Sequence, residues 1–127
     1  MISEQLWAEL CQVEGVSESP SSFGEEPALW VNGKEVAHRE GRLGIDIRLT
    51  RGLIRAQRAE LGANPAVTLR ASSSSDWLEV TVGDRAAEAL VLELVQQAAA
   101  AHRAEPGRRA AAQHRARRLG AGGRSGP

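Results

Sequence analysis

The dipeptide Asn32-Gly33 constrains this chain more than any other feature of its sequence. It separates the runs ALWV and KEVAH. A two-residue type I′ turn needs positive φ at both central positions, which Asn and Gly tolerate best. We therefore predict a tight hairpin, followed after a short loop by a third strand, GIDIRL.

The turn also predicts which side chains share a face of the hairpin, because side chains alternate along a strand. Counting outward from the turn places Trp30 opposite Glu35 and Leu29 opposite Val36. One face then carries Leu29, Val31, Val36 and His38, and the other carries Trp30, Glu35 and Ala37. In the third strand Ile45, Ile47 and Leu49 face one way, and Asp46 and Arg48 the other. His38 and Asp46 are thus expected on opposite sides of the sheet.

Helical and strand patterns on either side of this stretch supply the remaining elements. Ser3 is a predicted N-cap for a helix with Leu6, Leu10 and Val13 at helical spacing and Trp7 nearby. The segment VSESPSSF, broken by Pro20, predicts an edge strand or extended loop. The expected elements after the third strand are a helix RGLIRAQRAEL capped by Thr50, a strand at Ala66–Arg70, a loop at Ser72–Ser75, a strand at Trp77–Val82, and a helix from Asp84 to about His102.

These elements predict an α+β fold of two layers, an antiparallel sheet with helices packed on one face. The uncovered face would carry Trp30, Glu35, Asp46, Arg48, Trp77 and Glu79. Two tryptophans among charged residues make this face a candidate binding surface, since Trp is enriched at contact sites. The alternative is that each indole lies under a loop as part of the peripheral core.

Charge divides the chain into a domain, residues 1–102, and a tail, residues 103–127. The first part carries 15 acidic and 9 basic side chains, and the second carries seven arginines against Glu105. The tail composition predicts disorder. The single cysteine, Cys11, excludes an internal disulfide and a cysteine metal cluster, and we interpret it as an apolar filler. The start MISEQLWAEL does not resemble a signal peptide, so the cytoplasm is the expected location.

The order of motifs resembles the small bacterial proteins of the luciferase-domain family. The matching elements are Gly15-Val16, Phe23-Gly24, the strand Lys34–His38, Asp46-Ile47 before a helix, and the turn ending at Trp77. The resemblance covers residues 12–102. More loosely, the layout is similar to MmcQ/YjbR-like domains, which implies a double-wing α+β shape. The family implies no catalytic residue that can be transferred to this chain.

Polar residues suggest few catalytic possibilities. His38 and Asp46 would form a general-base pair if they met, although a histidine at a strand end is commonly structural. Ser72–Ser75 lacks a nucleophile elbow. His102 and His114 are far from His38 in the sequence, so we expect no metal site and no cofactor.

Three functions are therefore considered. The preferred one is a non-enzymatic module that binds a small molecule or a protein through the open sheet face. The second is a nucleic-acid-associated protein that uses the basic residues 103–127, although these lack aromatic residues for base stacking. The third is a small enzyme built around His38, Glu35 and Asp46. No membrane partner is expected.

Overall fold

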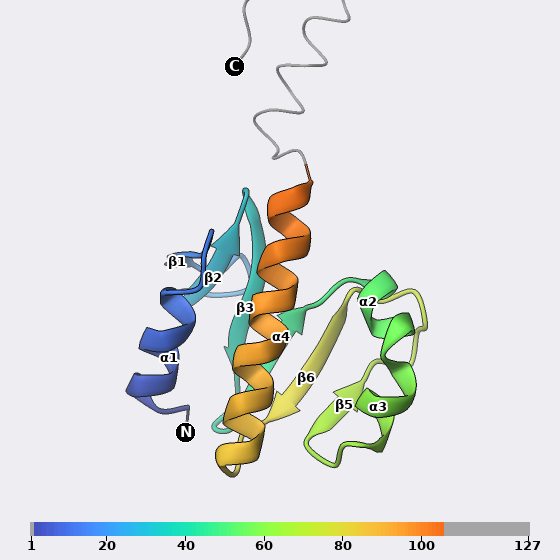
Figure 1. The fold of residues 1–127 in the computed structure, drawn as a ribbon. Coiled ribbons are helices and arrows are strands. Elements are labelled where there is room, and N and C mark those ends of the chain that lie inside the picture. The colour runs from blue at the N-terminus through green and yellow to red at the C-terminus, as the bar shows by residue number, and fades with distance from the viewer. Residues whose placement is uncertain (1, 106–127) are drawn as a thin grey trace, which may run out of the picture.

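The computed structural model describes residues 2–105 as an open six-stranded antiparallel sheet with four helices (Figure 1). This is the predicted α+β fold. The strand order is β1-β2-β3-β4-β6-β5. The strands are β1 (Ser17–Pro20), β2 (Pro27–Val31), β3 (Lys34–Glu40), β4 (Gly44–Arg48), β5 (Val67–Leu69) and β6 (Trp77–Thr81). The tail was predicted to begin at residue 103, but Arg103 and Ala104 still belong to the last helix. The rest of the predicted tail, from position 106 onward, and its suggested contact with nucleic acid lie outside the described residues.

The hairpin between β2 and β3 turns at Asn32 and Gly33, whose φ values are 55° and 82°. Near the turn the register is as predicted, with Trp30 opposite Glu35. One step further the prediction is wrong, because Leu29 pairs with Ala37 instead of Val36. Val36 is thus the extra residue of a β-bulge.

The bulge changes the face to which His38 belongs. Val36 and Ala37 follow each other directly, yet both are fully buried in the hydrophobic core. After them the alternation is shifted by one residue, so His38 lies on the open face and not on the predicted core face. It faces Asp46 directly across the β3–β4 ladder.

The helices are α1 (Glu4–Cys11), α2 (Arg51–Ala56), α3 (Arg58–Ala63) and α4 (Arg85–Ala104). The three predicted side-chain caps are present. Ser3 accepts from the Leu6 backbone amide at 3.1 Å, Thr50 from that of Leu53 at 3.3 Å, and Asp84 from that of Ala87 at 2.8 Å. The single helix expected after Thr50 is instead two helices, divided at Gln57. There the Gln57 side chain donates through Nε2 to Gln97 Oε1 of α4 at 2.7 Å. This contact places a polar group where the apolar stripe of a single helix would continue.

The helices cover one face of the sheet (Figure 1). Apolar residues from that face and from the helices form one core cluster, with Leu29, Ile45, Ile47, Leu78 and Val80 from the strands and Leu6, Leu10, Ile54, Leu61, Val91, Leu94 and Val95 from the helices. The cluster accounts for the two-layer arrangement, because each helix buries its apolar stripe against the same sheet face. Among residues 2–105, no helix has the length and apolarity needed to cross a membrane.

Asn32 links the hairpin to the end of α4. Its side-chain amide donates to the carbonyl oxygen of His102 at 3.1 Å and to that of Glu105. Lys34, just after the turn, lies 3.1 Å from the Glu105 carboxylate. Asn32 therefore supplies both the turn geometry and partners for carbonyl groups at the helix end, which a helix leaves without partners of its own.

Candidate functional site

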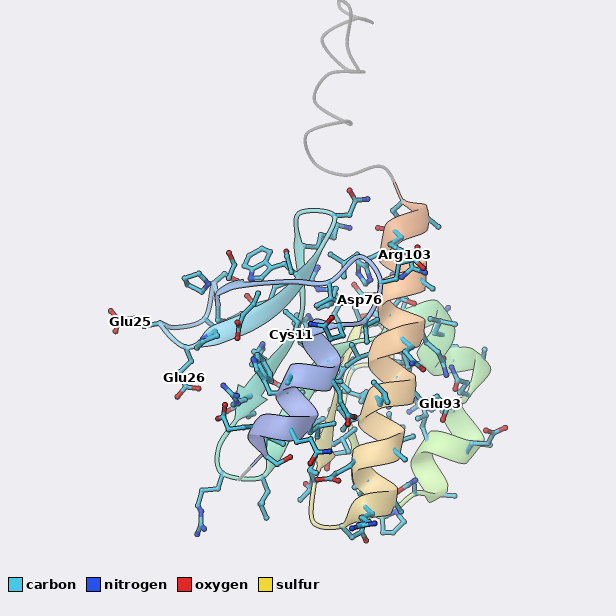
Figure 2. The ribbon with its side chains drawn as sticks, turned by 60° about the vertical axis from the view of Figure 1, so that its left-hand side comes forward. Cys11, Glu25, Glu26, Asp76, Glu93 and Arg103 are labelled. Carbon is cyan, nitrogen blue, oxygen red and sulfur yellow. The ribbon has the colours of Figure 1, made fainter. Side chains whose placement is uncertain are left out.

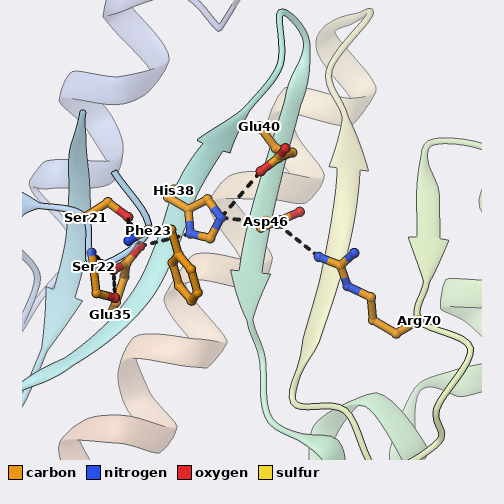
Figure 3. A network of polar contacts seen from close by, with 8 residues as sticks. All are labelled: Ser21, Ser22, Phe23, Glu35, His38, Glu40, Asp46 and Arg70. Atoms are coloured by element: carbon orange, nitrogen blue, oxygen red, sulfur yellow. Dashed lines mark hydrogen bonds and ion pairs between the residues drawn. The ribbon is translucent and has the colours of Figure 1, made fainter. Parts of the chain in front are cut away.

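The centre of the open sheet face is occupied by His38 and two carboxylates (Figure 3). His38 Nδ1 lies 2.9 Å from Glu35 Oε2, and His38 Nε2 lies 3.2 Å from Asp46 Oδ2. Both acids are buried, with exposed fractions of 2% for Glu35 and 6% for Asp46. Burying a charge is costly unless it is paired, so these groups stabilise one another as a cluster.

Glu35 anchors the loop between β1 and β2. Ser21 Oγ donates to Glu35 Oε2 at 2.6 Å, and Ser22 donates to Oε1 through its amide at 2.7 Å and its hydroxyl at 2.8 Å. Burial alone would raise the pKa of the Glu35 carboxyl, but these hydrogen bonds and nearby His38 outweigh it and hold that pKa below its ordinary value. Glu35 therefore remains ionised and fixes the loop on the sheet.

The loop places an aromatic ring over His38. The Phe23 ring lies 5.1 Å from the His38 ring and 6.1 Å from the Trp77 ring, measured between centroids, and the His38 and Trp77 rings are 5.3 Å apart. Phe23 nevertheless remains 68% exposed. Beyond Phe23, Figure 2 shows Glu25 and Glu26 projecting outward at the tip of the loop.

Two further charged groups complete the cluster. Arg70 donates to Asp46 Oδ2 at 3.0 Å, and Glu40 Oε2 lies 3.7 Å from His38 Nε2. Their side chains are 42% and 56% exposed, so they meet solvent at the rim. The polar contact with Asp46 raises the pKa of His38; burial opposes this, while the charges of Asp46 and Glu35 add to the increase.

A hollow of about 380 Å³ opens beside this cluster. It is lined by Phe23, His38, Glu40, Asp46, Arg70 and Trp77, together with Ser75. A second hollow of about 270 Å³ shares Phe23, His38 and Glu40 with it, so the two adjoin. The hollow of about 380 Å³ has a volume within the range of small-molecule sites. We call it the His38 pocket.

A larger hollow, about 930 Å³, lies by the N-terminal ends of α1 and α4. Its lining includes Ser3, Glu9, Asp84 and Glu88 but no histidine, no cysteine and no aromatic ring. None of the buried charged or polar side chains of the described chain lines it. Size alone therefore favours this hollow as a binding site, whereas the buried charged residues and aromatic rings favour the His38 pocket.

The structure brings together most of the predicted binding face but not both tryptophans. Arg48 stacks on Trp77, with Cζ 4.9 Å from the ring centroid, and Glu79 pairs with Asp46 across the β4–β6 ladder. Trp30 is separated from Trp77 by β3 and β4, about 14 Å at ordinary strand spacing. Its Nε1 is buried and makes no hydrogen bond within residues 2–105.

The sequence analysis missed Phe23, Glu40, Arg70 and the serine pair 21–22 as parts of this site. Arg70 and Asp46 are 24 positions apart and meet only because β5, β6 and β4 are neighbours. The interpretation of Cys11 agrees with its surroundings, because burial, with Glu18 nearby, raises the pKa of its thiol and makes it a poor nucleophile.

Comparison with known proteins provides no relative for the chain: no family model, no curated protein and no solved structure matches it. The resemblance to the luciferase-domain family and to YjbR-like domains therefore stays a prediction based on the motifs.

Proposed function

We propose that this protein is a small-molecule-binding module and that the His38 pocket is its binding site. The observation that carries the proposal is the position of Phe23. Its ring is 68% exposed, yet the loop that bears it is fastened to the sheet by three hydrogen bonds to Glu35. An apolar ring held in solvent above a hollow is the arrangement that a ligand would cover.

The pocket contains groups of two kinds that would act on one ligand. Phe23 and Trp77 offer flat apolar surfaces, while Arg70 and His38 offer hydrogen-bond donors. A ligand with a planar or apolar part and an acidic or other polar group would use both. This combination supports a small organic molecule over a second protein, because its polar groups converge on a concave surface.

The proposal is tested by screening small molecules against the full chain with tryptophan fluorescence and thermal unfolding. The panel includes nucleotides, sugar phosphates, amino acids and aromatic acids. Phe23→Ala and Trp77→Ala are expected to weaken binding at least about tenfold, the effect of losing about 1.4 kcal/mol of contact. Trp30→Phe is the matched control, since Trp30 does not line the pocket and is separated from Trp77 by β3 and β4. Unchanged binding in both pocket variants would remove the pocket as the site.

A second candidate, a small enzyme, is favoured by the way His38 is held. Carboxylates approach both ring nitrogens, and Nε2 is directed toward Glu40 and Asp46, which line the pocket. A histidine with a raised pKa is suited to donate a proton to a bound substrate. With a ligand from the screen, His38→Gln should abolish turnover and leave measurable binding; turnover equal to that of the unsubstituted chain excludes this candidate.

A further inference from the structure

We infer that His38, Glu40 and Asp46 bind a divalent transition-metal ion in the His38 pocket. This inference names a ligand for the same pocket and therefore rests on the pocket being the binding site. It depends on five features of the cluster: the spacing of the donor atoms, the support behind His38, an Asp46 oxygen without a hydrogen-bond partner in the described chain, the charge balance, and the chemistry of the donors.

The donor atoms are already spaced for a metal ion. His38 Nε2, a Glu40 oxygen and an Asp46 oxygen all lie within 4.8 Å of one another. The two shortest approaches to Nε2 are 3.2 Å from Asp46 Oδ2 and 3.7 Å from Glu40 Oε2. Ligand atoms about 2.0–2.2 Å from a zinc ion are separated from each other by about 3–3.5 Å. Only small side-chain movements are therefore needed.

The support behind His38 is the kind found behind metal-binding histidines. Such a residue usually directs its other ring nitrogen at a carboxylate, which fixes the tautomer and the ring orientation. Here Nδ1 lies 2.9 Å from Glu35 Oε2, and Ser21 and Ser22 hold that carboxylate in place. The pair is close but not aligned as a hydrogen bond, and Nδ1 has no other partner among residues 2–105. A proton on Nδ1 leaves the lone pair of Nε2 free for a metal.

Asp46 supplies an independent indication. It is 94% buried, and its Oδ1 makes no hydrogen bond within the described chain. Its other oxygen, Oδ2, is shared between His38 and Arg70. Buried carboxylate oxygens ordinarily accept a hydrogen bond. Asp46 lines the pocket, so its carboxylate can still accept a further partner there, such as a metal ion.

The charge of the cluster matches a divalent cation. Glu35, Glu40 and Asp46 contribute three negative charges, and Arg70 compensates one of them. With a neutral imidazole the remainder is −2, and the neighbouring Arg48 and Glu79 offset each other. Arg70 is 42% exposed and can turn toward solvent. It therefore serves as the counter-ion of the metal-free protein and competes with the metal for Asp46.

One imidazole nitrogen and two carboxylate oxygens suit zinc, cobalt or manganese better than magnesium or calcium, which prefer oxygen ligands alone. Three protein ligands also leave coordination positions open toward the pocket, as in metal sites that take up a further ligand. In this way a metal ion would provide an anchor for an acidic group of a small molecule.

The test uses the full chain freed of metal with a chelator. Zn²⁺ is titrated by calorimetry, and Co²⁺ by its visible absorption and by quenching of tryptophan fluorescence, since the Trp77 ring lies 5.3 Å from His38. One saturable site is expected for both ions, and much weaker binding for Mg²⁺ and Ca²⁺. The absence of a saturable signal at about 1 mM metal would overturn the inference.

Variants locate the site. His38→Gln and Asp46→Asn should weaken Zn²⁺ binding at least about a hundredfold, and Glu35→Gln about tenfold. Arg70→Gln should strengthen it, which a purely structural role for Arg70 does not predict. Glu40→Gln, at an exposed position, should weaken binding about tenfold without unfolding the chain. Unchanged affinity in both His38→Gln and Glu40→Gln would contradict the assignment.

Two controls show whether an observed metal occupies another site. Glu93→Gln changes an exposed carboxylate on α4, on the helical side of the sheet (Figure 2), and His114→Gln removes the tail histidine. Both should bind as the unsubstituted chain does. Loss of binding in either would overturn the site. If organic ligands bind in the pocket of a chain that binds no metal, the proposed function stands and this inference alone fails.

Discussion

His38 Nε2 and Asp46 Oδ2 lie 3.2 Å apart because their residues are directly opposed across the β3–β4 ladder. Since this pair belongs to two adjacent strands of the sheet, its geometry depends on the register of the strands more than on any loop. The loop of residues 21–26, which Glu35 holds through Ser21 and Ser22, places the Phe23 ring 5.1 Å from the His38 ring. The strands thus position the polar pair, and the loop positions the aromatic ring beside it.

The stability of the metal-free protein should depend on pH through His38 and Glu35. The folded pKa of His38 is raised above 6.5, so its contribution is complete below about pH 6.5 and is lost as pH rises through the folded pKa. The folded pKa of Glu35 is lowered below 4.5, so its contribution is complete above about pH 4.5 and is lost as pH falls through the folded pKa.

The two contributions are therefore both present between about pH 4.5 and 6.5. Urea unfolding with a chelator, across pH, measures the difference in unfolding free energy between the unsubstituted chain and His38→Gln. This difference should decline as pH rises above 6.5. A difference that grows there would show that Glu35, Asp46 and Glu40 do not stabilise the protonated imidazole.

Removing the hydroxyls that hold Glu35 should loosen the loop. Ser21→Ala with Ser22→Ala deletes two of the three hydrogen bonds to a buried carboxylate. Each such bond to a charged group contributes about 1.5–3 kcal/mol, so the double variant should unfold at markedly lower urea concentration. Ser73→Ala, in the exposed loop before β6, is the control and should unfold as the unsubstituted chain does. Equal midpoints for all three chains would show that Glu35 is satisfied by other groups.

Gly44, at the start of β4, should not tolerate a side chain. A Cβ there would lie 2.5 Å from the Glu40 carbonyl oxygen and 2.8 Å from Glu79 Oε2. The backbone contact cannot be relieved by a side-chain rotation, so Gly44→Ala should cost about 1–3 kcal/mol of unfolding free energy. Gly83→Ala meets nothing within 4 Å and provides the matched control. Similar thermal midpoints for the two variants would argue against this close packing at the β3–β4 turn.

Thr50 holds a backbone conformation that favours glycine, with φ 93° and ψ 146°. This strain costs about 1–3 kcal/mol in a residue with a side chain. The hydroxyl accepts from the Leu53 amide at only 3.3 Å, and glycine at an N-cap loses a few tenths of a kcal/mol. Thr50→Gly should therefore stabilise the protein by about 1 kcal/mol.

Thr50→Ala separates the two effects, because alanine loses the hydroxyl and keeps the strain. It should be less stable than the unsubstituted chain in the same urea titration. Should Thr50→Gly also be destabilised, the capping hydrogen bond would outweigh the backbone strain.

Much of the fold was predictable because local chemistry and tertiary packing agree. Asn32-Gly33 specifies its turn, Ser3 and Asp84 cap their helices, and strand alternation reproduces the core face of β4 and β6. The helix after Thr50 was predicted as one element and is two. At the division Gln57 leaves the helical backbone conformation, with φ −114° and ψ 15°, and its side chain donates to Gln97, 40 positions away.

The site was less predictable because it depends on groups that meet only in the folded chain. Glu35 and Asp46 were assigned to the open face, and both lie beside His38 there. Phe23 was used only as part of the motif resemblance, and nothing in the sequence indicates that its loop folds back to Glu35. The pairing of Arg70 with Asp46 likewise requires the strand order.

The extra residue in β3 has a consequence for how other sequences are searched. Glu35 and His38 are three positions apart, a separation that brings side chains together on a helix and sends them to opposite sides of a regular strand. The motif Glu-Val-Ala-His thus carries a helix-like spacing inside an extended segment. A search for this pair in other chains must therefore permit an odd interval next to two consecutive apolar residues, because a strict two-residue period would not recover the pair of this chain.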